Sequence, residues 1–177
     1  SIAKLEWRVR GRTIDVVNKI NIKIDRSIKA GAMAMGAKVR IRSIAGNLPM
    51  LQNKHMNNIY LNNAENIVGK NNVVLHPDDQ SGGSTDMGDL SQILPIIHPR
   101  SGGAEGTGHG NNYFIKDYEK SVINPAKAMA TTIIDLLWPD DMQINEVINN
   151  HKPNYSISEY IALQNKRMGN DFNDYTS

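Results

Sequence analysis

The stretch that decides the fold, residues 13–44, reads TIDVVNKINIKIDRSIKAGAMAMGAKVRIRSI. Its first part places isoleucine and valine at spacings of three and four, which predicts an amphipathic helix over about residues 13–35. Gly36 follows as a residue that can end the helix in the left-handed conformation. Over residues 37–44 apolar residues alternate with arginines, so this segment is predicted to be a strand with one buried face.

Upstream of this helix, residues 4–10 alternate in the same way. Leu5, Trp7 and Val9 point to one side, and the charged residues between them point to the other, which predicts another strand. Strand, long helix and strand form a βαβ unit, in which the two strands run parallel with a right-handed crossover. Two strands leave edges unpaired, so the unit is expected to need partner strands.

Downstream, the periodicity predicts a helix over about residues 53–68 and another from Asn124-Pro125 to Trp138, which Pro139 ends. A further helix is expected near residues 141–150, and the polar tail from Lys152 is expected to pack loosely. Short apolar runs predict buried strands at Val73–Leu75 and Ile93–Ile97. The predicted core stripe of the helix after Asn124 consists of Met129, Ile133, Leu136 and Leu137.

Composition excludes several classes of protein. The chain has 177 residues, a formal net charge of +2 and no cysteine. The charge does not require a nucleic-acid partner, and the absence of cysteine excludes disulfides and thiolate metal sites, which agrees with a cytoplasmic protein. No apolar run is long enough to cross a membrane, and the N-terminus lacks the layout of a secretory signal. Because it starts in a strand pattern without Met, we expect a chain cut from a longer parent.

Two glycine-rich loops are candidates for chemistry. The first, residues 81–89, surrounds Ser84, Thr85 and Asp86 with glycines that let the backbone approach a ligand, although a plain surface turn has the same composition. The second, residues 98–110, carries two histidines and a glutamate after an apolar run. Imidazole suits Zn²⁺, Mn²⁺ or Co²⁺, but a solvated histidine is the simpler interpretation of a loop.

Other histidines are weaker candidates. His55 lies on a polar helix face, where we expect it to be solvated. His76 and His151 lie at the ends of predicted elements, where a histidine often only caps a helix. The outward arginines of the two strands are expected to form a solvated sheet face.

Taken in order, these segments resemble the M20 family of metal-dependent peptidases and amidohydrolases, in the branch of the aminobenzoyl-glutamate hydrolases. About 140 residues share the family's order of motifs. The segments that carry the likeness are Gly83–Ser91, Leu94–Pro99, Glu105–His109, Ala126–Ala130, Asp135–Leu137, and, upstream, Ala34–Ala37 and Gly46–Pro49.

The resemblance implies an α/β (α+β) fold in two parts. Residues 1–70 would be the C-terminal half of an inserted ferredoxin-like dimerisation domain, and residues 71–177 the C-terminal segment of a zinc-peptidase-like catalytic domain. His109 matches the family's last metal ligand, and Ser84, Thr85 and Asp86 match a loop that borders the substrate site. The implied cofactor is a pair of divalent metal ions, Zn or Mn, and the implied partners are a small acyl-amino acid or dipeptide and a second copy of the chain.

The departure from the family is that its other metal ligands and its general-base glutamate belong to the half that precedes these motifs. The chain is therefore expected to hydrolyse nothing alone. Two alternatives stay open: a non-enzymatic dimerisation or interaction module, and an inactive truncated product.

Overall fold

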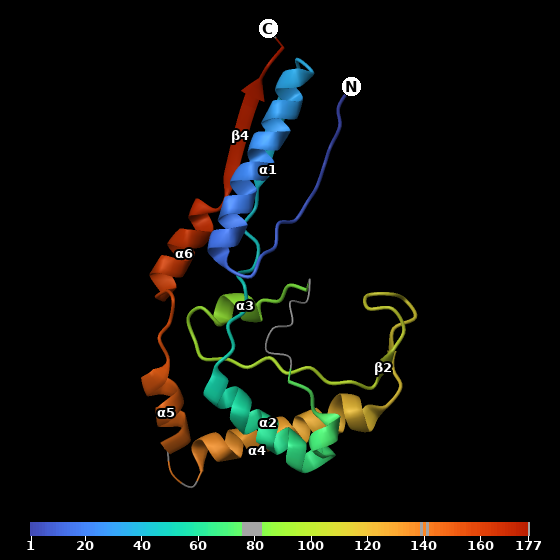
Figure 1. Cartoon of the computed structure of the whole chain (residues 1–177), viewed down its shortest axis with the longest axis vertical. Coiled ribbons are helices and arrows are strands. Elements are labelled where there is room, and N and C mark those ends of the chain that lie inside the picture. Colours follow the sequence, from blue (N-terminus) through green and yellow to red (C-terminus); the bar gives the residue numbers. More distant parts are fainter. Residues whose placement is uncertain (76–82, 139, 141, 177) are drawn as a thin grey trace. The chain divides into compact units, whose positions relative to one another are not determined.

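The chain has a mixed α+β fold, as the sequence predicts, in a computed structural model that describes residues 1–75, 83–138, 140 and 142–176 (Figure 1). Within these ranges it has six α-helices and two small two-stranded antiparallel sheets. The chain divides into two compact units. The first consists of residues 1–50, 80–93 and 154–177, and the second of residues 51–79 and 94–153.

The first unit is built around helix α1 (Ile14–Ala34). The helix begins at Thr13, whose side chain accepts a hydrogen bond from the backbone N–H of Val16 (3.3 Å) and so satisfies a donor of the first turn. It ends before Gly36, which has φ 57°. The predicted helix and its left-handed glycine are both confirmed.

Strand β1 (Lys38–Ser43) follows and confirms the predicted alternation, because Ile41 is buried while its arginine neighbours are exposed. Its partner, however, is β4 (Gly169–Asp174), and the pairing is antiparallel, with Lys38 opposite Asp174. The expected parallel pairing with residues 4–10 is wrong. Alternation shows that a segment can form a strand, but a strand also needs a ladder partner, and residues 4–10 have none here: Leu5 is 75% exposed.

The tail that was expected to pack loosely completes the first unit. It forms α6 (Ile157–Lys166) as well as β4, and α6 begins with a capping box between Ser156 and Glu159. The tail thus has regular secondary structure, which capping and strand pairing stabilise, but neither α6 nor β4 contains a buried residue, in agreement with the expected loose packing.

Buried polar side chains connect the three stretches of the first unit. Gln92, only 5% exposed, follows the short helix α3 (Met87–Leu90); its side-chain nitrogen donates to the carbonyl of Pro49 (2.6 Å), and its side-chain oxygen accepts from Asn154 (2.9 Å). The carboxylate of Asp89 accepts from the backbone N–H of Leu48 (3.0 Å) and from the side chain of Gln164 (3.2 Å). These residues hold distant parts of the sequence together by hydrogen bonds.

The second unit is mainly helical, with α2 (Lys54–Val68) and α4 (Asn124–Leu137) lying side by side (Figure 1). Asn53 caps α2 by accepting from the backbone N–H of Met56 (3.0 Å). Helix α5 (Met142–Asn150) follows α4, and a single 3-10 turn, η1 (Lys70–Asn72), follows α2. All three predicted helices are confirmed. The buried residues of this unit are Ile96, Ala128, Thr132, Leu136 and Val147.

Three details of the second unit differ from the predictions. The segments 73–75 and 93–97 form no strand; Leu75 is 61% exposed, whereas Ile96 is buried in irregular backbone. Short apolar runs do not separate strands from buried loops. Asn124 does not cap α4, because a π-helical segment, η2 (Glu119–Ile123), runs directly into it.

The predicted core stripe of α4 is also wrong apart from Leu136. Ile133 and Leu137 are 50% and 55% exposed, whereas Ala128 and Thr132 are buried beside α2. The helix is apolar on most sides, so periodicity does not select the side that packs. Pro139, which was expected to end this helix, lies outside the described residues. In the part of the chain that is described, no helix is long and apolar enough to cross a membrane.

Candidate functional site

The predicted metal ligand, His109, lies in a hairpin of the second unit. Strands β2 (Ala104–Glu105) and β3 (Phe114–Ile115) pair antiparallel, and His109 lies in the loop that joins them. Its side chain is exposed, and its backbone has φ 64°, a left-handed conformation that non-glycine residues adopt infrequently. The loop therefore presents this imidazole outward on a specific backbone turn.

Close contacts of the backbone define this loop. The N–H of Gly110 donates to the carbonyl of Thr107 (2.7 Å), and the N–H of Thr107 donates to the side chain of Asn112 (3.2 Å). Gly106 has φ 97°, and a Cβ atom there would lie 2.1 Å from the carbonyl oxygen of Asn112. Only glycine fits this position, which gives the glycine-rich sequence a steric reason.

The base of the hairpin is attached to the segment that leads into α4. The carbonyl of Gly103 accepts from the backbone N–H groups of Lys116 and Asp117 (2.9 Å each), and the hydroxyl of Ser121 donates to the carbonyl of Gly102 (2.7 Å). Gly103 has φ 94°, and a Cβ atom there would lie 2.5 Å from the hydroxyl oxygen of Ser121. His109 is thus carried on a loop whose base is fixed.

The described residues do not complete a metal site around His109, since they contain no group of three or more histidine, aspartate and glutamate side chains that could hold a metal ion. The nearby carboxylate of Glu105 forms an ion pair with Lys116. His98, which precedes the hairpin in the sequence, makes no hydrogen bond through its buried Nδ1 within the described structure. One imidazole suits a metal as a donor, but zinc sites use three or four protein ligands. The rest of a site would have to come from outside the described residues.

The predicted substrate-loop residues lie in the first unit, just before α3. The carboxylate of Asp86 accepts from the side chain of Asn47 (2.7 Å), and the hydroxyl of Thr85 accepts from the backbone N–H of Met87 (3.4 Å). Ser84 is exposed. These three residues and His109 therefore belong to different units of the chain. His76, Ser81 and Gly82 lie outside the described residues.

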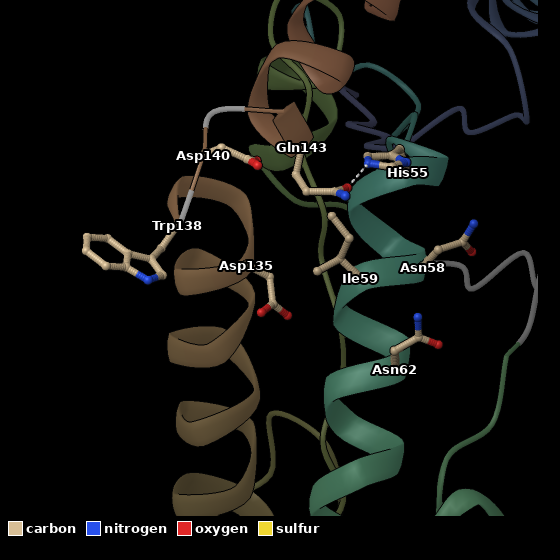
Figure 2. A pocket seen from close by; sticks show the side chains of 8 residues that line it. All are labelled: His55, Asn58, Ile59, Asn62, Asp135, Trp138, Asp140 and Gln143. Atoms are coloured by element: carbon tan, nitrogen blue, oxygen red, sulfur yellow. Dashed lines mark hydrogen bonds between the residues drawn. The ribbon is translucent and has the colours of Figure 1, made fainter.

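A hollow that the sequence did not indicate lies among α2, α4 and α5, with a volume of about 520 Å³ (Figure 2). His55 borders the hollow. Its position on a polar helix face predicted a solvated side chain, but its ring nitrogens lie close to neighbouring side chains. Its Nε2 lies 2.7 Å from the side-chain oxygen of Gln143, and its Nδ1 lies 3.6 Å from Glu146. The lining residues are His55, Asn58, Ile59, Asn62, Asp135, Trp138, Asp140 and Gln143.

The hollow is lined mainly by polar side chains, among them two carboxylates and three carboxamides. Asp135 and Asp140 point into it, whereas the indole of Trp138 points away (Figure 2). Both carboxylates are already engaged, because Asp135 accepts from the side chain of Asn63 (2.7 Å) and Asp140 from the backbone N–H of Met142 (3.2 Å). Among the described residues, its lining contains no serine, threonine, cysteine or lysine that could act as a nucleophile. No local sequence motif marks it, since its residues come from three helices and from the connection between α4 and α5.

Comparisons with known proteins returned no matching family model, no matching curated protein and no matching solved structure. The likeness to the M20 family is therefore carried by the ordered motifs alone.

Proposed function

We propose that the chain forms the C-terminal part of an M20-type metal-dependent amidohydrolase and contributes His109 as one ligand of its metal site. The substrate class is an N-acyl amino acid, an aminobenzoyl-glutamate-like compound or a dipeptide, cleaved at its amide bond. Residues 1–70 would belong to the inserted dimerisation domain and residues 71–177 to the catalytic domain. A cytoplasmic location, which suits a chain without cysteine, is part of the proposal.

The observation that supports it best is the construction of the His109 hairpin. A solvated loop histidine needs no particular backbone conformation, yet His109 has a left-handed φ of 64°. In the same loop, Gly106 cannot be replaced by a larger residue without a clash with the backbone of Asn112. Such a turn suits a side chain that must be presented in one direction. The ordered motifs on both sides of this loop supply the family context.

The chemistry assigned to this chain is limited to binding. When bound, the two metal ions would polarise the amide carbonyl and lower the pKa of a bound water. His109 would hold one ion through a neutral imidazole nitrogen. Ser84, Thr85 and Asp86 would border the substrate. The general base lies outside this chain, so the chain alone is expected to be inactive.

The test uses the natural protein that contains this chain, purified from its source, and measures its metal content and its hydrolysis of amides. Purified protein should contain Zn or Mn and should hydrolyse at least one compound of a panel of N-acyl amino acids, aminobenzoyl-glutamate and dipeptides. His109→Ala should lower the metal affinity by about 10-fold or more and abolish hydrolysis. His151→Ala is the matched control and should leave both unchanged. A metal-free protein, or one in which His109→Ala retains full metal and activity, would contradict the proposal.

The alternative, a non-enzymatic dimerisation or interaction module, draws support from the small sheet of the first unit. Strands β1 and β4 pair only with each other, so each has an outer edge without a ladder partner in the described structure. An unpaired edge can accept a strand from a second copy. A stable dimer without metal or hydrolytic activity in the source protein would favour this function.

A further inference from the structure

The hollow among α2, α4 and α5 is separate from the proposed metal ligand and substrate loop. Its described lining includes neither His109 nor any of the residues Ser84, Thr85 and Asp86. Its volume of about 520 Å³ lies within the roughly 300–1,000 Å³ of small-molecule sites, which often form between packed helices. The hollow is therefore large enough to hold a ligand of its own.

The side of α2 that borders the hollow is polar, which is unusual for a helix that lies beside another. His55, Asn58, Ile59 and Asn62 recur at spacings of three and four, so they share one side of α2. A helix normally turns an apolar stripe towards its neighbour, yet α2 contains no buried residue although it lies along α4. Helix packing alone does not explain three polar side chains at this place, whereas a polar occupant of the hollow does.

Two carboxylates give the hollow a negative charge. Asp135 and Asp140 both point into it (Figure 2). Each accepts a hydrogen bond from an uncharged donor, the side chain of Asn63 for Asp135 and the backbone N–H of Met142 for Asp140. A carboxylate has about four lone-pair positions, so both can accept further hydrogen bonds. The described residues of the lining include no lysine or arginine that would balance these charges.

The other lining groups indicate which kind of cation fits. The side-chain oxygens of Asn58 and Asn62 can accept hydrogen bonds, and Ile59 between them offers an apolar contact. Carboxylates also attract metal ions, but the described residues contain no group of three or more histidine, aspartate and glutamate side chains that could hold one. An organic cation with N–H donors and a short apolar chain matches this lining better.

We propose that the hollow binds a small organic cation with two ammonium groups, of the aliphatic diamine class. One ammonium group donates hydrogen bonds to Asp135 and the other to Asp140, while the methylene chain packs along Ile59. Such charge-assisted hydrogen bonds are about twice as strong as those between neutral groups. The proposal does not depend on the hydrolase function, because the hollow and the His109 loop share no lining residue, so either can fail alone.

The first test titrates the full chain with 1,4-diaminobutane at low ionic strength and follows the side-chain amide signals of Asn58 and Asn62 by NMR. The signals should shift to saturation with a Kd of about 1 mM or below, as expected for a ligand of this size. 1,4-Butanediol has the same carbon chain without charge and should give no saturating shift. Absence of saturation by the diamine, or equal affinity for the diol, overturns the proposal. Displacement of the diamine by tighter binding of Zn²⁺ or Mg²⁺ would assign the hollow to a metal ion and also overturns it.

The second test removes one charge at a time. Asp135→Asn keeps an oxygen that can accept from Asn63, so the helices should stay packed while the affinity for the diamine falls by about 10-fold. Asp140→Asn keeps an acceptor for the N–H of Met142 and should act similarly, which leaves the test informative if Asp135→Asn disturbs the fold.

Glu119→Gln is the matched control for both variants. It removes the same charge from the same unit, but Glu119 is 63% exposed and lies outside the hollow, so the affinity for the diamine should not change. Equal weakening by all three variants would show a general attraction of cations to the chain and would overturn the proposed site.

Discussion

Each of the two units is stabilised internally by a different kind of contact. In the second unit, helices α2, α4 and α5 bury Ala128, Leu136 and Val147, and the contacts are mostly apolar. In the first unit, three separate stretches of sequence meet through the hydrogen bonds of Gln92 and Asp89. A helix pair such as α2 and α4 can therefore be predicted from local periodicity, whereas the first unit depends on polar contacts between residues far apart in the chain.

The largest expected effect comes from the apolar contact of the second unit. Leu136→Ala should lower the free energy of unfolding by about 3 kcal/mol, because Leu136 is 7% exposed and its removal leaves a cavity beside α2. Leu137→Ala, at a position 55% exposed, should cost less than about 1 kcal/mol. Urea unfolding with hydrogen exchange of α2 and α4 measures both. Equal costs would show that the face of α4 has been assigned wrongly.

A backbone contact in the first unit should give the next largest effect. A Cβ atom on Gly88 would lie 2.0 Å from the carbonyl oxygen of Leu48, so Gly88→Ala should cost about 1–3 kcal/mol. Hydrogen exchange should become faster in β1 and β4 while α2 and α4 keep their protection. Gly31→Ala is the control and should change the free energy of unfolding in the opposite direction. A Cβ atom at Gly31, inside α1, would have no other atom within 4 Å, so alanine should stabilise the helix by about 0.5–1 kcal/mol. Uniform loss of protection in both units by Gly88→Ala would contradict an effect confined to the first unit.

The smallest effect concerns acid at the β1–β4 pair. Hydrogen bonds from Lys38, then from Thr176, lower the pKa of Asp174 to about 2. Since this folded value lies below the roughly 3.9 of an unfolded aspartate, the contribution to stability is complete above about pH 4 and is lost as the pH falls towards 2. Asp174→Asn should remove that part of the acid sensitivity, with a small amplitude because the pair is exposed. Carboxyl chemical shifts and urea midpoints across this range test it, with Asp25→Asn as the control.

What the sequence predicts correctly is local. Four helices and β1 followed from the spacing of apolar residues, and the end of α1 from Gly36. The capping roles of Thr13 and Asn53 were not predicted. The partner of β1 could not be predicted, because Gly-Asn-Asp-Phe-Asn-Asp in β4 has no apolar alternation. Its pairing instead depends on Lys38 opposite Asp174 and on Arg40 over the ring of Phe172 (5.5 Å).

The candidate site shows the same limit. Glycine spacing around His109 indicated an unusual loop, and Gly106 has a steric reason for being glycine. The hydrogen bonds that fix the base of the hairpin, between Gly102 and Ser121, involve residues of ordinary composition and gave no signal. The hollow beside His55 depends on how three helices pack, which single-helix periodicity does not describe.

The nesting of one unit inside the other has a consequence for the order of folding. Every residue of the second unit lies between β1 and β4 in the sequence. At a synthesis rate of roughly 5–20 residues per second, β1 waits on the order of ten seconds for its strand partner, while the contacts between α2 and α4 can already form. Because the intervening chain is so long, we expect the β1–β4 ladder to form late in assembly. Until that step, β1 is an open edge on the nascent chain, and its three outward cations, Lys38, Arg40 and Arg42, protect it against pairing with another chain.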